Sequence, residues 1–532
     1  MPGLNKKRIL KSLYFLPVAL FCVYIFIGAL SYKLHDFGNS YFPSLLKKER
    51  IAPESIIFDI YEFNSYVWKA GYEDLILDFY YNSPFTITAF YPLTFIEDAY
   101  VAKAIFNVIS CFALMYCVFL LVRMYNIKHL WGLLFIPLVF YIPIKNGLFY
   151  GQAYLLVLFL VVYGFYQVAK RKHFLGTSAL GFAALLKFFP VFYGIPFLFK
   201  RNWKAVWIGI LVTFIWIGVA IIHSGFNLWD FYFFDVMPNG MRNGTVMDFR
   251  VNSQSFDVFL KTLFVQDSYY NPEAILDYPR LYRLSIWLIK GVILGITIQL
   301  SWLKRTELFT LLAIWVVALF LLQSKSASYA QILWIIPAFY LYRSELSWKT
   351  KGVFFLLLLF VANFPITRLV DLPVFFRFSR LWFSLGLAII FFRGLHIKID
   401  WRFIPAALIL LLPLNTKLFI GEEPDNAVYV LDSKKHFMIY DYEAVAGKLQ
   451  YGALGRHGDE KITTSIPINS FEKDRCKLID NQIYVDGKQL TQSSELKKKP
   501  VLVNECEVYY LGDRLSRRGA FTLKKIDICN VL

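Results

Sequence analysis

The stretch KSLYFLPVALFCVYIFIGALSY, Lys11 to Tyr32, decides the class of fold. It is apolar over about twenty residues, the length that an α-helix needs to cross a bilayer. The basic run KKRILK precedes it, and no good small-x-small cleavage site follows. A signal peptide begins in the same way but has a shorter apolar segment and a cleavage site. We therefore interpret this stretch as a retained signal anchor.

The composition extends the same conclusion to most of the chain. Of the 532 residues, 57% are hydrophobic and 19% aromatic, and the mean hydropathy is +0.49. Soluble domains are about 45–50% apolar, so this excess indicates a bilayer as solvent. The net charge of +18 comes mostly from short loops between apolar segments. A nucleic-acid-binding protein would instead gather its basic residues on one face of a soluble domain.

The basic loops predict which way each apolar segment crosses the membrane. If the amino terminus is cytoplasmic, the loops at KRKH, KRNWK, LKRTE, YRSELSWKTK and RGLHIKIDWR all fall inside, as the positive-inside rule requires. About thirteen transmembrane helices result, and the carboxyl terminus lies outside. They are expected near residues 12–32, 99–122, 130–148, 153–169, 174–199 (two short helices broken at KFFP), 204–223, 284–302, 307–323, 329–343, 351–364, 380–393 and 402–416.

Two further regions stand out from this helical pattern. The outer loops 33–98, 224–283 and 365–379 are too long to be simple turns, and we expect surface helices in the first. After about residue 416 the sequence alternates apolar and polar residues, as in NAVYVLD and CEVYYLGD, with a hairpin turn predicted at Asp486-Gly487. The prediction is a polytopic α-helical membrane domain, residues 1–416, followed by a small β-rich extracytoplasmic domain, residues 417–532.

Three of the six cysteines lie in this tail. Cys476, Cys506 and Cys529 fit no zinc-binding spacing. In an extracytoplasmic domain one disulfide is plausible. We expect Cys476–Cys506.

The predicted outer face gathers charged and amide side chains. In isolation each has an ordinary explanation: Asp36 as a solvated loop acid, Gln152 as a helix cap, and Lys187 as a lysine that reaches the interface with its long stem. An aspartate at the end of a rigid helix is also suited to act as a general base, and arginine is suited to bind phosphate. The set predicted on this face is Asp36, Gln152, Lys187, Arg250, Asn252, Ser255, Lys325, Gln331, Arg377 and Arg380.

The order of several motifs resembles a known family. DFGNSYF, GQAYLL, LGFAALLKFFPVF, VNSQSF and SASYAQILWIIP follow one another over roughly residues 10–415 as they do in glycosyltransferase family 87. The glycine-glutamine pair, followed by Lys-x-x-Pro, is the most specific part. Members of this family often carry Trp-x-His in the late outer hairpin, where this chain has Tyr329-Ala330-Gln331. This departure leaves open a sugar donor other than the mannosyl lipid typical of the family.

The resemblance implies a GT-C membrane enzyme that uses a polyprenyl-phosphate sugar. Asp36 matches the proposed catalytic base, and Gln152, Lys187, Asn252 and Ser255 match motif positions. Arg250, Gln331, Arg377 and Arg380 are our further candidates for binding the donor phosphate or substrate. The expected reaction is an inverting, mannosyltransferase-like transfer to a glycolipid or glycan acceptor on the periplasmic face of a bacterial inner membrane. We expect no metal and no other cofactor, because no DxD-type motif occurs on the outer face.

Two other classes of protein remain open from the residues alone. A transporter or flippase of a lipid-linked sugar would bind phosphate with the same cations, but it needs a polar path to both faces, and the inner loops here are short and basic. An interaction scaffold would depend on the β-rich tail and would leave the Asp36 loop unexplained. The sugar, the acceptor, the linkage and the role of the tail do not follow from the sequence.

Overall fold

The computed structural model describes most of the helical region and parts of the tail. The described residues are 14–51, 56–57, 60–72, 75, 77, 82–233, 253–265, 271, 274–324, 326–369, 372–396, 400–412, 428–431, 437–440, 444–445, 448–454, 460–467, 475–479, 482–492, 496–513 and 522–529. The chain divides into two compact units, one of residues 1–51, 67–225 and 248–418, the other of residues 52–66, 226–247 and 419–532.

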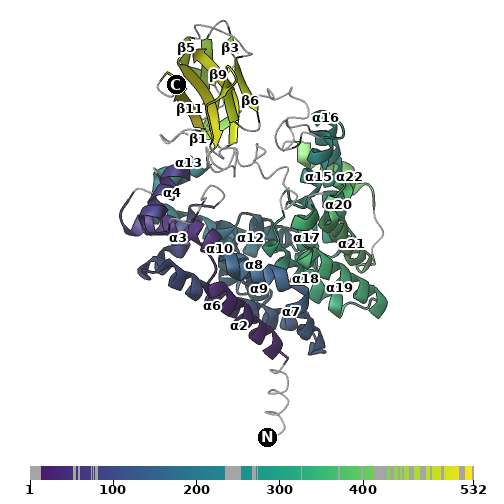
Figure 1. Ribbon diagram of the computed structural model, residues 1–532. Coiled ribbons are helices and arrows are strands. Elements are labelled where there is room, and N and C mark those ends of the chain that lie inside the picture. Colours follow the sequence, from purple (N-terminus) through teal and green to yellow (C-terminus); the bar gives the residue numbers. More distant parts are fainter. Residues whose placement is uncertain are drawn as a thin grey trace. The chain divides into compact units, whose positions relative to one another are not determined.

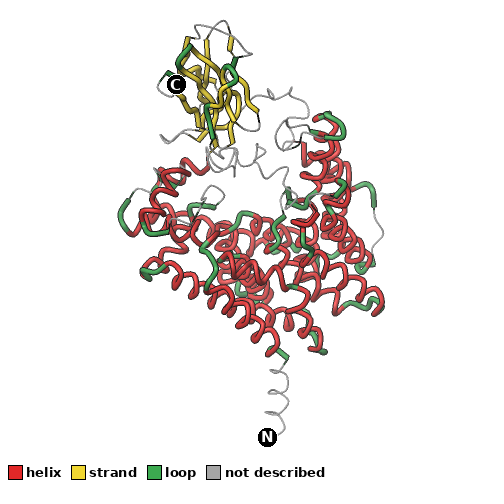
Figure 2. Tube along the Cα trace, in the orientation of Figure 1, coloured by secondary structure: helices red, strands yellow, loops and turns green. Residues whose placement is uncertain are grey.

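Helices make up the described part of the first unit (Figures 1 and 2). The described α-helices are α2 (Leu16–Leu30), α3 (His35–Lys48), α4 (Ile60–Lys69), α5 (Phe85–Phe90), α6 (Ala99–Met124), α7 (Ile136–Val139), α8 (Tyr141–Tyr150), α9 (Tyr154–Ala169), α10 (His173–Leu186), α11 (Ile195–Phe199), α12 (Trp203–Ser224), α13 (Phe226–Phe231), α15 (Phe256–Phe264), α16 (Pro279–Leu303), α17 (Leu308–Leu322), α18 (Ile335–Arg343), α19 (Trp348–Asn363), α20 (Val374–Arg377), α21 (Ser379–Arg393) and α22 (Phe403–Leu411). Short 3₁₀ turns are η2 (Tyr91–Phe95), η3 (Leu130–Phe135), η4 (Phe189–Gly194), η7 (Tyr329–Trp334) and η8 (Ile366–Leu369).

A helix lies at each position where the sequence predicts a span, and the break expected at KFFP separates α10 from η4. By length and composition, three described helices, α6, α12 and α16, are able to cross a membrane, or five segments if each bent pair counts as one span. The shorter apolar helices do not meet that test, so the count of thirteen spans is not confirmed. The protein is nevertheless a helical membrane protein, because long apolar helices with exposed apolar faces require a lipid environment.

Helices α9 and α10 of this unit cross closely because glycines lie at their crossing. On α9, a Cβ at Gly164 would lie 2.8 Å from the carbonyl oxygen of Gly176 on α10, and one at Gly176 would lie 2.6 Å from that of Gly164. Small residues at crossings let helix backbones approach closely, which is the usual way that helices associate in lipid. The α9–α10 pair therefore sets the relative position of the turns at its ends, where two of the predicted site motifs lie.

A bend between the first two helices places the predicted site motif at a corner. The axes of α2 and α3 differ by 68° across the break at residues 31–34. The helix expected in the first outer segment is thus present as α3. A second bend, of 59°, separates the η3–α7 segment from α8. Helix α2 packs against α8, so the carboxyl ends of α2 and α8 lie near each other.

The described strands of the tail are antiparallel throughout. They are β1 (Val428–Leu431), β2 (Phe437–Tyr440), β3 (Ala444–Val445), β4 (Lys448–Leu454), β5 (Glu460–Pro467), β6 (Cys476–Ile479), β7 (Gln482–Val485), β8 (Lys488–Gln489), β9 (Leu496–Asn504), β10 (Glu507–Asp513) and β11 (Thr522–Asp527), paired as β1-β2, β3-β4-β5, β6-β7-β8 and β11-β10-β9. Ile483, Val508 and Ile528 are among the residues of a small buried core. Asp486 and Gly487 have φ of +50° and +79°, the left-handed pair that a type I′ hairpin needs, so the predicted turn is confirmed.

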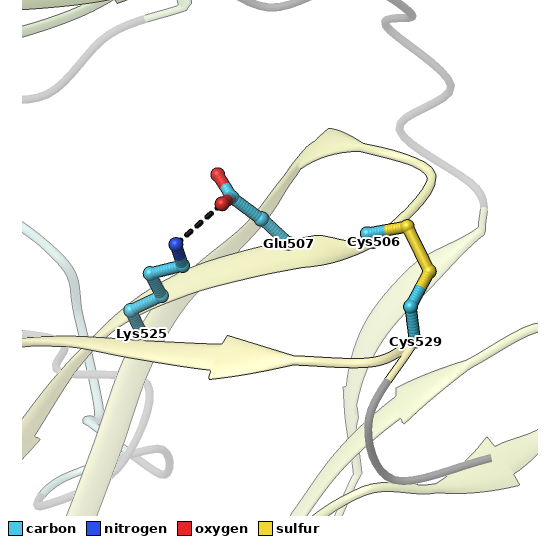
Figure 3. Close-up of a disulfide and its surroundings, with 4 residues drawn as sticks. All are labelled: Cys506, Glu507, Lys525 and Cys529. Atoms are coloured by element: carbon cyan, nitrogen blue, oxygen red, sulfur yellow. Dashed lines mark hydrogen bonds and ion pairs between the residues drawn. A yellow bond between two sulfur atoms is a disulfide. The ribbon is translucent and has the colours of Figure 1, made fainter.

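The predicted disulfide is wrong. Cys506 pairs with Cys529, whose Cα atoms are 5.0 Å apart (Figure 3). The strand register explains this pairing, because Glu507 on β10 is opposite Asp527 on β11, and their flanking residues meet just beyond the strand ends. Cys476 begins β6, where it pairs with Val485 instead. It is half-buried and not disulfide-bonded, and burial raises the pKa of its thiol to about 11.

Candidate active site

Asp36 lies at the corner between α2 and α3. It occupies the first turn of α3, directly after His35, whose φ is +43°. A carboxylate in the first turn is favoured by the helix dipole and by the unpaired backbone N–H groups there. The sharp change in chain direction thus leaves Asp36 at the start of a helix rather than within a solvated loop.

Gln152 holds one oxygen of Asp36. Its side-chain amide donates a hydrogen bond to Oδ2, and the amide of Asn39 lies 3.5 Å from Oδ1, at the limit of a hydrogen bond. Gly151 makes this contact feasible, because it ends α8 with a φ of +64° and because a Cβ there would lie only 2.5 Å from the Cβ of Phe37. The backbone of the GQAY motif therefore packs directly against a side chain of the DFGNS motif. Within the described residues, Oδ1 of Asp36 has only the long contact with Asn39.

A buried lysine that the sequence analysis missed connects the two turns. Lys103, on α6, is 2% exposed. Its ammonium donates to the carbonyls of Tyr32 at 3.0 Å, Lys33 at 2.6 Å and Phe149 at 2.6 Å, which accounts for all three N–H groups. One turn further along α6, Asn107 donates to the carbonyl that precedes Phe149. A lysine inside a predicted span was the signal available for finding it.

Lys187 lies on the same side as Asp36. It follows the last residue of α10 with extended backbone, and its ammonium is 5.8 Å from the ring centre of Tyr154. The ring of Tyr154 is in turn 4.9 Å from that of Tyr329. Tyr154 is two residues after Gln152, which binds Asp36. Lys187 is therefore close to the segment that holds Asp36.

Gln331 helps to hold the turn that carries Tyr329. Its Nε2 donates to the hydroxyl of Ser326 at 2.6 Å and to the carbonyl of Ala327 at 3.2 Å, and its Oε1 accepts from the indole of Trp334 at 3.1 Å. Both N–H groups are thus used within the hairpin, and the side chain is buried. A direct contact of Gln331 with substrate stays a prediction, and its observed hydrogen bonds are structural.

Ser255 joins the VNSQSF motif to the same hairpin. Its hydroxyl caps α15 by accepting from the N–H of Val258 at 3.3 Å, and it donates to the carbonyl of Ser324 at 2.6 Å. The preceding residue, Gln254, donates to the carbonyl of Arg377 at 2.8 Å. The VNSQSF segment is thereby joined both to the loop that follows α17 and to α20.

An ion pair beside Ser255 was not predicted. Asp257 accepts from the ammonium of Lys290, from the hydroxyl of Ser324 at 2.6 Å and from that of Tyr282 at 2.9 Å. Burial alone would raise the pKa of Asp257, but the charge of Lys290 and these hydrogen bonds together hold it below its usual value. The pair is satisfied internally, so it anchors α15 to α16.

Arg380 is a buried cation that has no anionic partner among the described residues. It is 2% exposed, and its Nη2 lies 3.5 Å from the carbonyl oxygen of Phe364. Within the described residues its Nε and Nη1 atoms have no hydrogen-bond partner. Leaving a buried guanidinium in this state is costly unless an anion binds to it. Arg377, by contrast, is half-buried and donates to the carbonyl of Leu372.

The predicted residues fall into connected groups. Asp36, Gln152 and Lys187 belong to one group, and Ser255 and Arg377 belong to a second, which shares the α17–η7 hairpin with the first. Ser324, in the second group, is five residues from Tyr329, in the first, so their Cα atoms are at most about 18 Å apart. Arg250, Asn252 and Lys325 lie outside the described residues.

No cluster of three or more histidine, cysteine, aspartate or glutamate side chains able to hold a metal occurs among the residues that the structure describes. The expectation of a metal-independent reaction is untested and stays a prediction.

Comparison with known proteins gives one finding. The model of glycosyltransferase family 87 matches residues 79–324. The matched range includes Gln152, Lys187 and the Asp257–Lys290 pair, and it ends before Arg380. No curated protein matches the chain.

Proposed function

We propose that this glycosyltransferase, whose residues 79–324 match the model of glycosyltransferase family 87, transfers a mannose-like sugar from a polyprenyl phosphate, with inversion, to a glycolipid or glycan. The proposed general base is Asp36. The observation that carries this proposal is the state of its carboxylate: Gln152 fixes one oxygen, while the other has only a marginal contact. A base must be held in place and still have a lone pair available for a substrate hydroxyl, and this arrangement meets both requirements.

The proposed step is a single displacement. The acceptor hydroxyl gives its proton to Oδ1 of Asp36 as its oxygen attacks the anomeric carbon. The bond from that carbon to the phosphate oxygen breaks, and its electron pair leaves with the lipid phosphate. Proton transfer to a positioned base contributes roughly 10²–10⁴-fold to the rate.

The leaving phosphate gains negative charge, so it needs a cation rather than a proton. Lys187 lies beside Tyr154, two residues after the glutamine that binds Asp36, and is our first candidate. Arg380 is the second, because two of its guanidinium nitrogens lack partners within the described residues. Arg250, and behind it Arg377, complete the proposed set. A preorganised cation beside a developing charge supplies several kcal/mol of barrier reduction.

The proposed setting is the outer face of a bacterial inner membrane, with the amino terminus cytoplasmic and the β-rich domain periplasmic. The positive-inside pattern supports this orientation, because it puts the ends of α2, α8, α10 and α17 on the outer side. A lipid-linked donor then keeps its chain among the helices and its sugar at the corner beside Asp36.

The test is sugar transfer by the full chain in lipid. Radiolabelled polyprenyl-phosphate mannose is supplied with a panel of glycolipid acceptors, and donor binding is measured separately. We expect Asp36→Asn to bind donor and to lose transfer by roughly 10²-fold or more. The matched control is Glu97→Gln, which removes an exposed acid from the same outer segment and should leave transfer unchanged.

Equal transfer by wild type and Asp36→Asn would remove Asp36 from the mechanism. If neither transfers mannose, the same pair of proteins is assayed with other polyprenyl-phosphate sugars. Absence of transfer with every such donor would refute the proposed donor class.

A further inference from the structure

An apolar groove lies between α7, α18 and α19, away from the candidate active site. It is lined by residues within 127–140, 335–342 and 348–359, and its volume is about 500 Å³. These three helices carry neighbouring labels in Figure 1, and α19 contacts both of the others. The lining is almost entirely aliphatic and aromatic. Pockets of this volume hold small apolar ligands or chains.

A buried positive charge is placed at one end of this groove. Lys351, in the first turn of α19, lines the groove and is 7% exposed. Its ammonium donates to the carbonyl of Tyr342 at 3.0 Å and lies 4.9 Å from the ring centre of Trp348. It forms no ion pair with a described residue. A buried ammonium with one carbonyl partner and no counter-charge favours an anion.

The same end of the groove has the features of a membrane–water boundary. Trp131 is 62% exposed and Trp348 is 72% exposed. Tryptophan rings gather at the level of lipid headgroups. Lys128, Arg343 and Lys349 are also exposed at this end. Below it the apolar side chains of Leu138 and Leu356 are exposed, as expected for a surface open to acyl chains.

This end is remote from Asp36. The α17–η7 hairpin, which carries Tyr329 towards the active site, leads into the amino end of α18, whereas the charged end of the groove is at its carboxyl end. The length of α18 alone separates the hairpin from the charged end of the groove by about 13 Å, given a rise of 1.5 Å per residue over nine residues. On the predicted topology the charged end faces the cytoplasmic leaflet, where anionic lipids attract basic residues.

We propose that the groove binds one anionic glycerophospholipid, with its phosphate at the ammonium of Lys351 and its acyl chains along α7 and α19. The lipid completes the counter-charge that the described residues lack and fills the space between the two helices. This site is separate from the proposed donor site and does not depend on the transferase mechanism.

Gly352 offers a variant that blocks the groove without disturbing the fold. It lines the groove, and a Cβ built on it meets no atom within 4 Å. A phenylalanine there would occupy the space proposed for the acyl chain. Gly218, on α12, provides the matched control, because a Cβ there also meets nothing within 4 Å and it does not line the groove.

The experiment is native mass spectrometry of the full chain, titrated with phosphatidylglycerol, phosphatidylcholine or polyprenyl phosphate. We expect wild type and Gly218→Phe to retain one phosphatidylglycerol in preference to phosphatidylcholine. Lys351→Met should weaken this binding roughly tenfold or more, since a hydrogen bond to a charged group is lost. Gly352→Phe should abolish it.

Two results would overturn the proposal. Equal binding of phosphatidylglycerol and phosphatidylcholine that neither Lys351→Met nor Gly352→Phe changes would show that lipids only coat this surface. Preferential binding of polyprenyl phosphate that both substitutions remove would give the groove a different occupant.

Discussion

Replacing Lys103 with methionine tests whether the two turns of the candidate site are aligned by one buried ammonium. The substitution keeps the length of the side chain and removes three hydrogen bonds to carbonyls. Hydrogen bonds from a charged donor contribute a net stabilisation of about 1.5–3 kcal/mol each, so three of them contribute roughly 4.5–9 kcal/mol. The substitution leaves three carbonyls without this donor, and we expect a loss of stability of several kcal/mol.

The effect on catalysis can be measured separately from this loss of stability. Lys33 is three residues before Asp36, and Phe149 is three residues before Gln152, so the clamp holds the two turns in register. A misplacement of about 1 Å at a reacting group costs on the order of 10²-fold in rate. We therefore expect kcat of Lys103→Met, measured well below its lowered melting temperature, to fall about 100-fold while donor KM changes little.

The assay is steady-state transfer in lipid, together with thermal unfolding of the same preparations. Lys170→Met is the control, because this exposed lysine contacts only the ring of Tyr166 among the described contacts. A wild-type kcat for folded Lys103→Met would refute the alignment argument. A loss of kcat that equals the unfolded fraction of the preparation would assign Lys103 to stability instead.

Three further substitutions have distinct expected results. Gly151→Ala adds a Cβ 2.5 Å from that of Phe37 at a left-handed φ, which costs about 1–2 kcal/mol before the clash, so both the melting temperature and transfer should fall. Replacing Cys506 and Cys529 with serine opens a 23-residue loop and should lower the stability of the tail by about 3 kcal/mol in denaturant titrations, whereas reductant should not destabilise that double mutant further. Arg380→Met should raise donor KM at least tenfold while leaving the melting temperature unchanged or higher, because it removes an uncompensated buried charge; an unchanged KM would exclude Arg380 from donor binding.

The helices were predictable because their signals are local. Apolar length gave α6, α12 and α16 within a few residues, and the proline in KFFP gave the break before η4. The turn at Asp486-Gly487 was likewise determined by two adjacent residues. The disulfide was not predictable, because it depends on which residues of β10 and β11 are opposite each other, and that register is a long-range property.

The same distinction applies to the candidate site. Asp36 and Gln152 were proposed from motif order, and the structure brings them into contact although 115 residues separate them in the chain. Their proximity depends on the packing of α2 against α8, which no local pattern specifies. The pairing of Asp257 with Lys290 escaped prediction for the same reason. Each residue alone is an ordinary helix residue, and only the crossing of α15 and α16 makes them an ion pair.

The partners of the buried cations separate structural roles from ligand binding. All three N–H groups of Lys103 donate to backbone carbonyls, and the charge of Lys290 is neutralised by Asp257. Neither ammonium is therefore available to bind a substrate anion. Within the described residues, Arg380 and Lys351 have no anionic partner, although both are more than nine-tenths buried. Because burying an uncompensated charge opposes folding, these two positions are difficult to explain by stability alone. Our two proposals assign to each an anion from outside the chain: the donor phosphate for Arg380 and a phospholipid headgroup for Lys351.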